Sequence, residues 1–263
     1  MTATAPAKTA AASATVAPLE FIRPSGEGKP TFLSAALTGG APKVLFETQM
    51  LPAEIQDMRP LKPTLSVDRE GFQLIDDAST VVDFYDDDEI VRVYHPEVEA
   101  LVKRVLGASR VVVFDTTRRA DNTKGAANPD GLRGPAGRVH VDYTVGSGPV
   151  RLADVIGAYE AKRLLDGGVR VAQINVWRPI VGPVRRSPLA LADASSVAPE
   201  DLIATDQVFP DRTGEIYHLA PAAAQRWYYA PLMTPDEALL IKGWDTDPAP
   251  SSPHSSSGSN RTL

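Results

Sequence analysis

The spacing of apolar residues along this chain predicts where its helices lie. Between residues 96 and 107, apolar side chains recur every three or four positions, which is the spacing of one face of an α-helix. Pro96 suits the first turn of such a helix and Gly107 suits its end. The helix is expected to pack on a core through the stripe Val98, Leu101, Val102, Val105 and Leu106.

Shorter runs rich in β-branched and aromatic residues, bounded by turn-forming residues, are typical of strands. We expect strands within residues 42–50, 109–119, 139–144, 169–180, 214–221 and 225–232. Residues 150–168 predict an amphipathic helix closed by Gly167 and Gly168, and residues 118–138 predict a long loop. A mixed N-terminal half followed by a strand-rich C-terminal half predicts a mainly β fold with a barrel or sandwich core and flanking helices.

The ends of the chain differ in composition from its centre. Residues 1–18 are rich in Ala and Thr, and we expect a disordered arm there, followed by a single domain over residues 19–263. The arm lacks the basic start and compact apolar core of a signal peptide. No apolar run approaches the roughly 20 residues of a membrane-spanning helix. We therefore expect a cytoplasmic protein that does not act in a membrane.

Charge and cysteine content narrow the chemistry. The 263 residues carry 27 Lys and Arg against 33 Asp and Glu, a net charge of −6, which disfavours nucleic acid as a partner. The chain has no cysteine, so disulfides, thiolate–zinc sites, iron–sulfur clusters and cysteine nucleophiles are excluded. Any metal must be held by His, Asp or Glu. The oligomeric state cannot be read from the sequence.

The stretch GRVHVDYT places His140 and Asp142 two positions apart in a predicted strand. Side chains at positions i and i+2 of a strand point to the same face, so the imidazole and the carboxylate project together while Val139 and Val141 point the other way. One interpretation is a polar pair on a sheet face. The other is two ligands of a facial triad that leaves three coordination positions open on Fe(II).

Three histidines are candidates for a third ligand. His95 stands at the predicted helix start, His218 lies in a predicted strand, and His254 lies 114 positions after His140 (254 − 140). Intervening strands can return the chain across a barrel and bring His254 back to the pair. The residues alone leave this choice open.

Several longer segments carry a resemblance to a known family. They are VYHPEVEALVKRVLGASRVVVFDTTRR, PAGRVHVDYT, INVWRPIVGPVRRSPLALADASSV, RWYYAPLMTPDEALLIKGWDT and PHSS, in this order, over roughly residues 44–256. Together they resemble the AsaB-type hydroxylase/desaturase family, which includes proteins associated with cephamycin methoxylation. That family is similar to Fe(II)/2-oxoglutarate oxygenases built on a double-stranded β-helix, a jelly-roll or cupin-like fold. The resemblance implies Fe(II), 2-oxoglutarate and O2 as cofactor and co-substrates.

The resemblance also implies site residues. His140 and Asp142 match the H-x-D ligand pair, and His254 in PHSS matches the distal histidine. The family usually continues with a strand that carries a carboxylate-anchoring arginine, whereas this chain stops nine residues after His254. We therefore expect a short, truncated or replaced final strand. Arg261 is the only arginine after His254 and is a candidate for binding the co-substrate carboxylate.

Other residues are candidates for contacts with the co-substrate and the substrate. In VAQINVWRPI, alternation puts Gln173, Asn175 and Trp177 on one strand face and Arg178 on the other. If the first face lines the pocket, Asn175 supplies amide hydrogen bonds and Trp177 a wall. If the second does, Arg178 can pair with a carboxylate. Arg178 as a structural residue is the competing interpretation. The expected pocket residues are Tyr143, Trp177 and Tyr228.

The leading hypothesis is a non-haem Fe(II)/2-oxoglutarate oxygenase that hydroxylates or desaturates a small specialised metabolite. The alternative is a degenerate member of the fold that binds a small molecule without turnover. A methyltransferase or a serine hydrolase is disfavoured, because no glycine-rich nucleotide loop follows a strand and no G-x-S-x-G motif is present.

Overall fold

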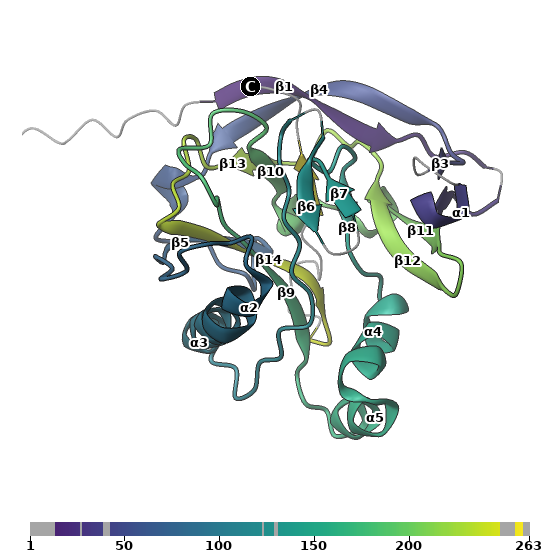
Figure 1. Cartoon of the computed structure of the whole chain (residues 1–263). Helices are drawn as coiled ribbons and strands as arrows, with labels where there is room; N and C mark the ends of the chain where they lie inside the picture. The colour runs from purple at the N-terminus through teal and green to yellow at the C-terminus, as the bar shows by residue number, and fades with distance from the viewer. Residues whose placement is uncertain are drawn as a thin grey trace, which may run out of the picture.

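The described part of the chain forms a large and a small packed sheet and a two-stranded β6–β7 ribbon, and helices α2 to α5 lie along one side (Figure 1). The computed structural model describes residues 14–26, 28–38, 43–122, 124–128, 131–247 and 256–259. The strands are β1 (Ala14–Ile22), β2 (Thr31–Leu33), β3 (Lys43–Val44), β4 (Thr48–Asp57), β5 (Phe72–Asp76), β6 (Ala126–Asn128), β7 (Gly131–Arg133), β8 (His140–Val141), β9 (Ala172–Trp177), β10 (Leu189–Ala192), β11 (Leu202–Val208), β12 (Thr213–Leu219), β13 (Trp227–Tyr229), β14 (Glu237–Asp245) and β15 (Ser256–Ser259). The helices are α1 (Ala35–Thr38), α2 (Asp87–Glu89), α3 (His95–Leu106), α4 (Ser147–Ile156) and α5 (Ala158–Asp166), with a π-helical turn (Ile90–Tyr94) before α3 and 3-10 turns at Arg59–Leu61, Ala194–Ser196 and Pro199–Asp201.

The larger sheet has the strand order β1-β4-β13-β10-β15-β8-β12-β11-β2-β3, and the smaller sheet has the order β5-β14-β9. Phe72 and Leu239 of the smaller sheet pack with Leu191 and Tyr228 of the larger one in a shared core cluster. A second core cluster lies on the larger sheet and includes Val139, Val141, Ala192, Leu219 and Trp227. The sheets are therefore joined face to face by apolar side chains.

Helix α3 confirms the helix expected at residues 96–107. It has Pro96 in its first turn, and Gly107 follows its last residue. Leu101 is buried and packs with Leu240 of β14, while Ile174 of β9 packs against the same cluster. Helix α3 thus covers the outer face of the smaller sheet. No helix in the described ranges is long and apolar enough to cross a membrane.

The strand β1 begins earlier than the end of the expected arm. Its residues pair with β4 in antiparallel register from Ala14 to Ile22. Ala17, Leu19 and Phe21 are buried, and they alternate with residues on the other face, which is the period-2 pattern of a strand. The expected boundary at residue 18 is therefore too late. Residues 1–13 lie outside the described part of the chain.

Two further expectations were wrong. The single helix expected at residues 150–168 is two helices, because Gly157 adopts φ 89°, a conformation that favours glycine and ends α4. The strand expected at residues 109–119 has no regular structure, and Val112 and Phe114 on it are partly exposed. The strands expected at 42–50, 139–144, 169–180, 214–221 and 225–232 are present as β3–β4, β8, β9, β12 and β13, with different bounds: β4 continues to Asp57.

The ion pair Arg59–Glu237 links the start of β14 to the turn after β4. Arg59 donates two hydrogen bonds to the Glu237 carboxylate, whose side chain is 8% exposed, and also donates to the Pro231 carbonyl. The Thr234 amide donates to the same carboxylate. The Arg59 hydrogen bond is the main reason that the pKa of Glu237 lies below its ordinary value.

We expect Glu237→Gln to lower the free energy of unfolding at pH 7 by about 1–2 kcal/mol, since Arg59 is only partly buried. A depressed folded-state pKa stabilises the fold above the unfolded-state value, and this contribution is lost as the pH falls through the folded-state value. Urea unfolding between pH 7 and pH 3 should therefore show the two proteins converging in acid. The exposed pair Arg23–Glu47 offers the control Glu47→Gln, for which we expect no change. Equal effects of the two substitutions would contradict the prediction.

Candidate metal centre

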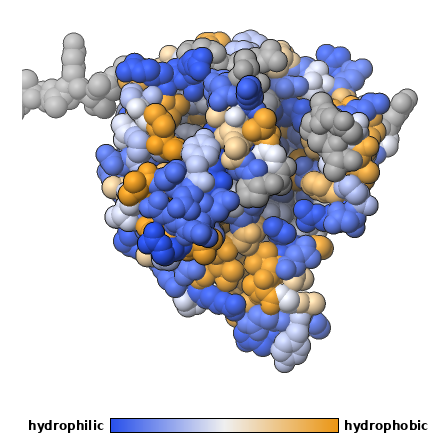
Figure 2. Space-filling model, viewed as in Figure 1, coloured by the Kyte–Doolittle hydropathy of each residue, from blue (hydrophilic) through white to orange (hydrophobic). Residues whose placement is uncertain are grey.

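A cleft of about 2810 Å³ opens between the two sheets and is walled by β8, β9, β12, α4 and the irregular segment 107–121. This volume exceeds the roughly 300–1,000 Å³ of ordinary ligand pockets. Figure 2 shows apolar side chains gathered on the face between α3 and the α4–α5 pair. Val112 and Phe114 of the irregular segment are 41% and 36% exposed and belong to the cleft wall. The cleft thus combines an apolar wall with the polar groups described next.

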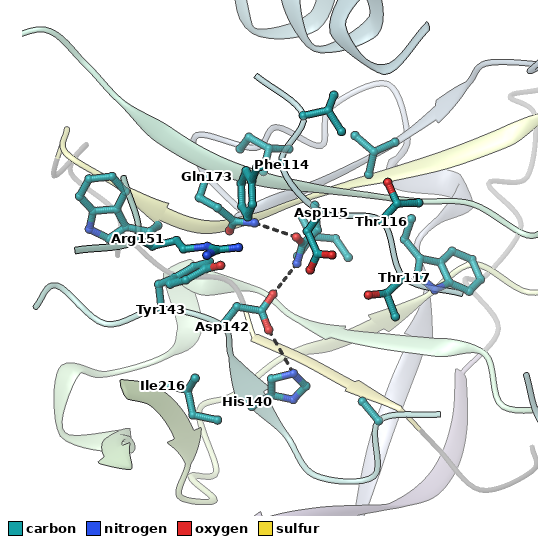
Figure 3. Close-up of a pocket in the computed structure, with 18 of the residues that line it drawn as sticks. Phe114, Asp115, Thr116, Thr117, His140, Asp142, Tyr143, Arg151, Gln173 and Ile216 are labelled. Atoms are coloured by element: carbon teal, nitrogen blue, oxygen red, sulfur yellow. Dashed lines mark hydrogen bonds and ion pairs between the residues drawn. The ribbon is translucent and has the colours of Figure 1, made fainter. Parts of the chain in front are cut away.

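His140 and Asp142 lie on the same face of the chain at β8 and point into the cleft (Figure 3). His140 Nε2 is 3.3 Å from Asp142 Oδ1. Val139 and Val141 on the other face are 1% and 2% exposed and belong to the core. The expected alternation is confirmed, and it presents an imidazole and a carboxylate to one point.

The His140 ring is oriented by the backbone. Its Nδ1 lies 2.8 Å from the carbonyl oxygen of Arg138, to which Nδ1–H can donate. A proton on Nδ1 leaves the lone pair on Nε2, which faces Asp142 and is the atom available to a metal. Burial acts to lower the pKa of His140, but its hydrogen bond with Asp142 and the carboxylate's charge outweigh burial, and the net shift is upward.

Asp142 is held from the facing sheet. The Asn175 side-chain amide on β9 donates to Asp142 Oδ2, and the Gln173 amide donates to Asn175 Oδ1 at 2.7 Å. Burial acts to raise the pKa of Asp142, but the His140 and Asn175 hydrogen bonds outweigh it and the pKa lies below its ordinary value. The carboxylate is therefore charged at neutral pH, as a metal ligand must be.

The residues described supply two of the three expected ligands. Among them, no three His, Asp or Glu side chains are grouped to hold a metal ion. His254 and Arg261 lie outside the described ranges. The donor set of one imidazole and one carboxylate, converging on a cleft, suits Fe(II) in a facial site.

The other two histidines have structural contacts. His218 on β12 pairs with His140 in register, but its ring contacts Phe46 and its Nδ1 lies 3.1 Å from Thr205 Oγ1. Burial, with the nearby charges of His140 and Arg138, lowers the pKa of His218 to about 3. The His95 ring is hydrogen-bonded to Thr116.

Of the two strand faces that could line the cleft at β9, the structure has the face that carries Gln173, Asn175 and Trp177. Asn175 faces the cleft with Gln173, while Ile174 packs outward beneath α3. Trp177 borders the cleft and also packs on the shared core cluster. Arg178 is 9% exposed and donates to Asp77 and to the Pro235 carbonyl, which gives it a structural role at the strand end.

The two tyrosines have different environments. Tyr143 borders the cleft, and burial raises the pKa of its phenol. The structure does not bring Tyr228 to the cleft: its ring lies 6.0 Å from that of Phe72 in the shared core cluster. Sequence reasoning missed most of the arginines that border the cleft, among them Arg119, Arg138 and Arg151. Arg151 could have been identified from the sequence, because it lies one helical turn after the start of α4 and nine residues after Asp142.

Comparison with known proteins identifies relatives of the whole chain. A model of the family described as oxidoreductase/YMDC permease-like domain matches residues 19–262. The hydroxylase/desaturase efuI of Hormonema carpetanum is 32% identical over 230 residues, covering 80% of this chain and 76% of the relative. The Fe(II)/2-oxoglutarate-dependent dioxygenase nvfI of Aspergillus novofumigatus is 29% identical over 245 residues, covering 89% of this chain and 85% of the relative.

A solved structure of the iron and alpha-ketoglutarate-dependent endoperoxidase NvfI is similar to this chain with a TM-score of 0.81 and 27% identity, covering 94% of this chain and 90% of that one. The likeness confirms the expected mainly β, double-stranded β-helix core with flanking helices. The family match over residues 19–262 and the identity to efuI show that the chain belongs to this oxidoreductase family.

Proposed function

We propose that this protein is an Fe(II)/2-oxoglutarate-dependent oxygenase of the AsaB type that hydroxylates or desaturates a small specialised metabolite. The observation that carries the proposal is the His140–Asp142 pair, which presents Nε2 and a charged carboxylate to a cleft. The relatives named as a hydroxylase/desaturase and as an Fe(II)/2-oxoglutarate-dependent dioxygenase support it. The small-molecule substrate and the cytoplasmic location stay predictions from the sequence.

The proposed metal ligands are His140, Asp142 and His254. His254 precedes β15 by two residues, and Ser257 of β15 is paired with His140. This pairing brings the chain that follows His254 beside the first ligand. It supports the assignment of the distal ligand that the family resemblance implies.

The chemistry proposed for the site is oxidation of a C–H bond. Bound Fe(II) supplies the redox chemistry by which O2, 2-oxoglutarate and a substrate R–H become R–OH, succinate and CO2. The chain's own residues fix the ligands and enclose the reactants. The Arg138 carbonyl fixes the His140 tautomer, the Asn175 amide orients Asp142, and Val112 and Phe114 add apolar side chains to the cleft wall.

The first test is an anaerobic titration of the purified chain with Fe(II) and 2-oxoglutarate, followed by the visible metal-to-ligand charge-transfer band. We expect a band in the parent that is lost in His140→Ala and in His254→Ala, because each substitution removes a ligand. His95→Ala is the control that should retain it, since that ring is bonded to Thr116.

The outcomes separate the two functional hypotheses. A parent protein that binds no iron and shows no band would contradict the oxygenase and favour a binding protein without turnover. A band that persists in His254→Ala would remove His254 from the ligand set.

Asn175→Ala tests the support of the carboxylate ligand. Loss of the amide donor frees Asp142 to rotate, so we expect Fe(II) affinity to fall by about 10- to 100-fold. Equilibrium titration with Fe(II) under argon measures the effect. Asn122→Ala is a matched control, because Asn122 Oδ1 accepts bonds from the Lys124 and Gly125 amides of its own loop. An unchanged iron affinity in Asn175→Ala would show that the amide does not hold Asp142.

A further inference from the structure

The amide that holds Asp142 is itself held by a second amide. Asn175 donates to Asp142 Oδ2, and Gln173 Nε2 donates to Asn175 Oδ1 at 2.7 Å. Figure 3 draws both hydrogen bonds as dashed lines between Gln173 and Asp142. A charged carboxylate only accepts hydrogen bonds, so Asn175 must turn its NH2 group toward Asp142 and its oxygen toward Gln173. The Gln173 NH2 group must then point at Asn175, which gives the chain of bonds a single direction.

This direction leaves the side-chain oxygen of Gln173 facing Gly243 of β14. Gln173 Oε1 is buried and has no hydrogen-bond partner among the described residues. A Cβ at position 243 would overlap this oxygen and would lie 3.1 Å from Gln173 Cδ. The φ angle of Gly243 is not positive, so the position requires the absence of a side chain and not a special backbone conformation. Any other residue type at position 243 would compete with Gln173 for the same space.

A β-bulge places Gly243 at this point. Lys242 pairs with Ile174 and Trp244 pairs with Gln173, so Gly243 is the extra residue of β14 opposite β9. Bulges redirect the side chains around them and are common beside functional sites. Here the bulge brings a residue without a side chain against the amide that supports Asn175.

The two strands are fixed in register just beyond the bulge. The Val171 amide donates to Thr246 Oγ1 at 2.8 Å, and the Thr246 amide donates to the Val171 carbonyl at 2.9 Å. Arg170 donates to both carboxylate oxygens of Asp245, which is buried. Because these contacts hold the end of β9 against β14, the strand is not free to shift away from a side chain at position 243.

We infer that Gln173 and Gly243 position the metal ligand Asp142. Gly243 leaves the room that Gln173 occupies, and Gln173 in turn fixes the Asn175 amide that bonds to the carboxylate. Both residues act through Asn175 and not by binding the metal, and the inference rests on the proposed function. Keeping Oδ2 on the Asn175 amide leaves Oδ1, the oxygen beside His140 Nε2, for the metal.

The first test removes one hydrogen-bond donor without changing the shape of the side chain. Gln173→Glu puts an oxygen where the NH2 group donates to Asn175. We expect the Fe(II) dissociation constant, measured by equilibrium titration under argon, to rise by about 5- to 10-fold. This is less than for Asn175→Ala, because residue 173 is one bond further from the ligand. Gln207→Glu is the control, since Gln207 borders the same cleft and the substitution adds the same charge.

The second test is a double-mutant cycle between the two positions. Gly243→Ala should displace Gln173 and weaken Fe(II) binding by about 5- to 10-fold, and Gln173→Ala should weaken it equally. The double variant should lose no more than either single variant, instead of the roughly 25- to 100-fold expected of independent sites. The reason is that the new methyl group then has the space that the amide occupied. Gly214→Ala in β12 is the control glycine, because a Cβ there would lie at an ordinary 3.9 Å from the Gln207 carbonyl oxygen.

A spectroscopic measurement separates positioning from general destabilisation. The visible absorption bands of bound Co(II) depend on the number and arrangement of its ligand atoms. We expect these bands to shift in Gln173→Glu and in Gly243→Ala and to stay unchanged in the two controls. The thermal midpoint of each metal-free variant shows whether it is folded, and Gln173→Glu tests the inference even if Gly243→Ala does not fold.

The remaining outcomes distinguish the inference from the proposed function. A parent protein that binds neither ion would overturn both. A parent that binds Fe(II), with unchanged affinity and unchanged Co(II) bands in Gln173→Glu, would overturn the inference and leave the oxygenase function intact. Losses that multiply in the double variant, or that Gly214→Ala shows equally, would also overturn it.

Discussion

The two-residue period of the strand at β8 is the constraint on which the cleft depends. Because β8 lies between β12 and β15, its register is set on both edges, and a slip of one residue would exchange the two valines for His140 and Asp142. The cost of moving two apolar side chains out of the core therefore also fixes the direction of the imidazole and the carboxylate. Core packing and site geometry are here one constraint.

The orientation of Asp142 also depends on how the two sheets pack against each other. Asp142 follows β8 of the larger sheet, whereas the amide that orients it comes from β9 of the smaller one. The relative position of the two sheets, set by apolar packing that includes Phe72 and Leu191, therefore determines the orientation of the carboxylate. Substitutions in this core can change metal binding without contacting the metal.

The sequence predicted those features that depend on local periodicity. The helix from Pro96 to Gly107, most strands and the shared face of His140 and Asp142 follow from spacing alone. The irregular segment 109–119 was mistaken for a strand because its composition suits one. Whether a strand forms there depends on a partner strand, which composition does not reveal.

Contacts between residues that are far apart in the sequence could not be predicted from local periodicity either. Asn175 and Asp142 are 33 positions apart and meet only because two sheets pack together. Arg178 and Tyr228 carried the expected chemistry but are held by Asp77 and by core side chains. Arg151 was overlooked because its position in a helix does not show that it borders the cleft.

The nine-residue pairing of β1 with β4 has a consequence for handling the protein. In the strand order, β4 lies between β1 and β13, so β1 covers an edge that would otherwise present free N–H and C=O groups. A chain shortened to begin at residue 19 loses more than half of that cover, and exposed strand edges pair readily with other chains. The integrity of β1 therefore determines how much of the β4 edge is exposed, a consequence separate from anything that occurs in the cleft.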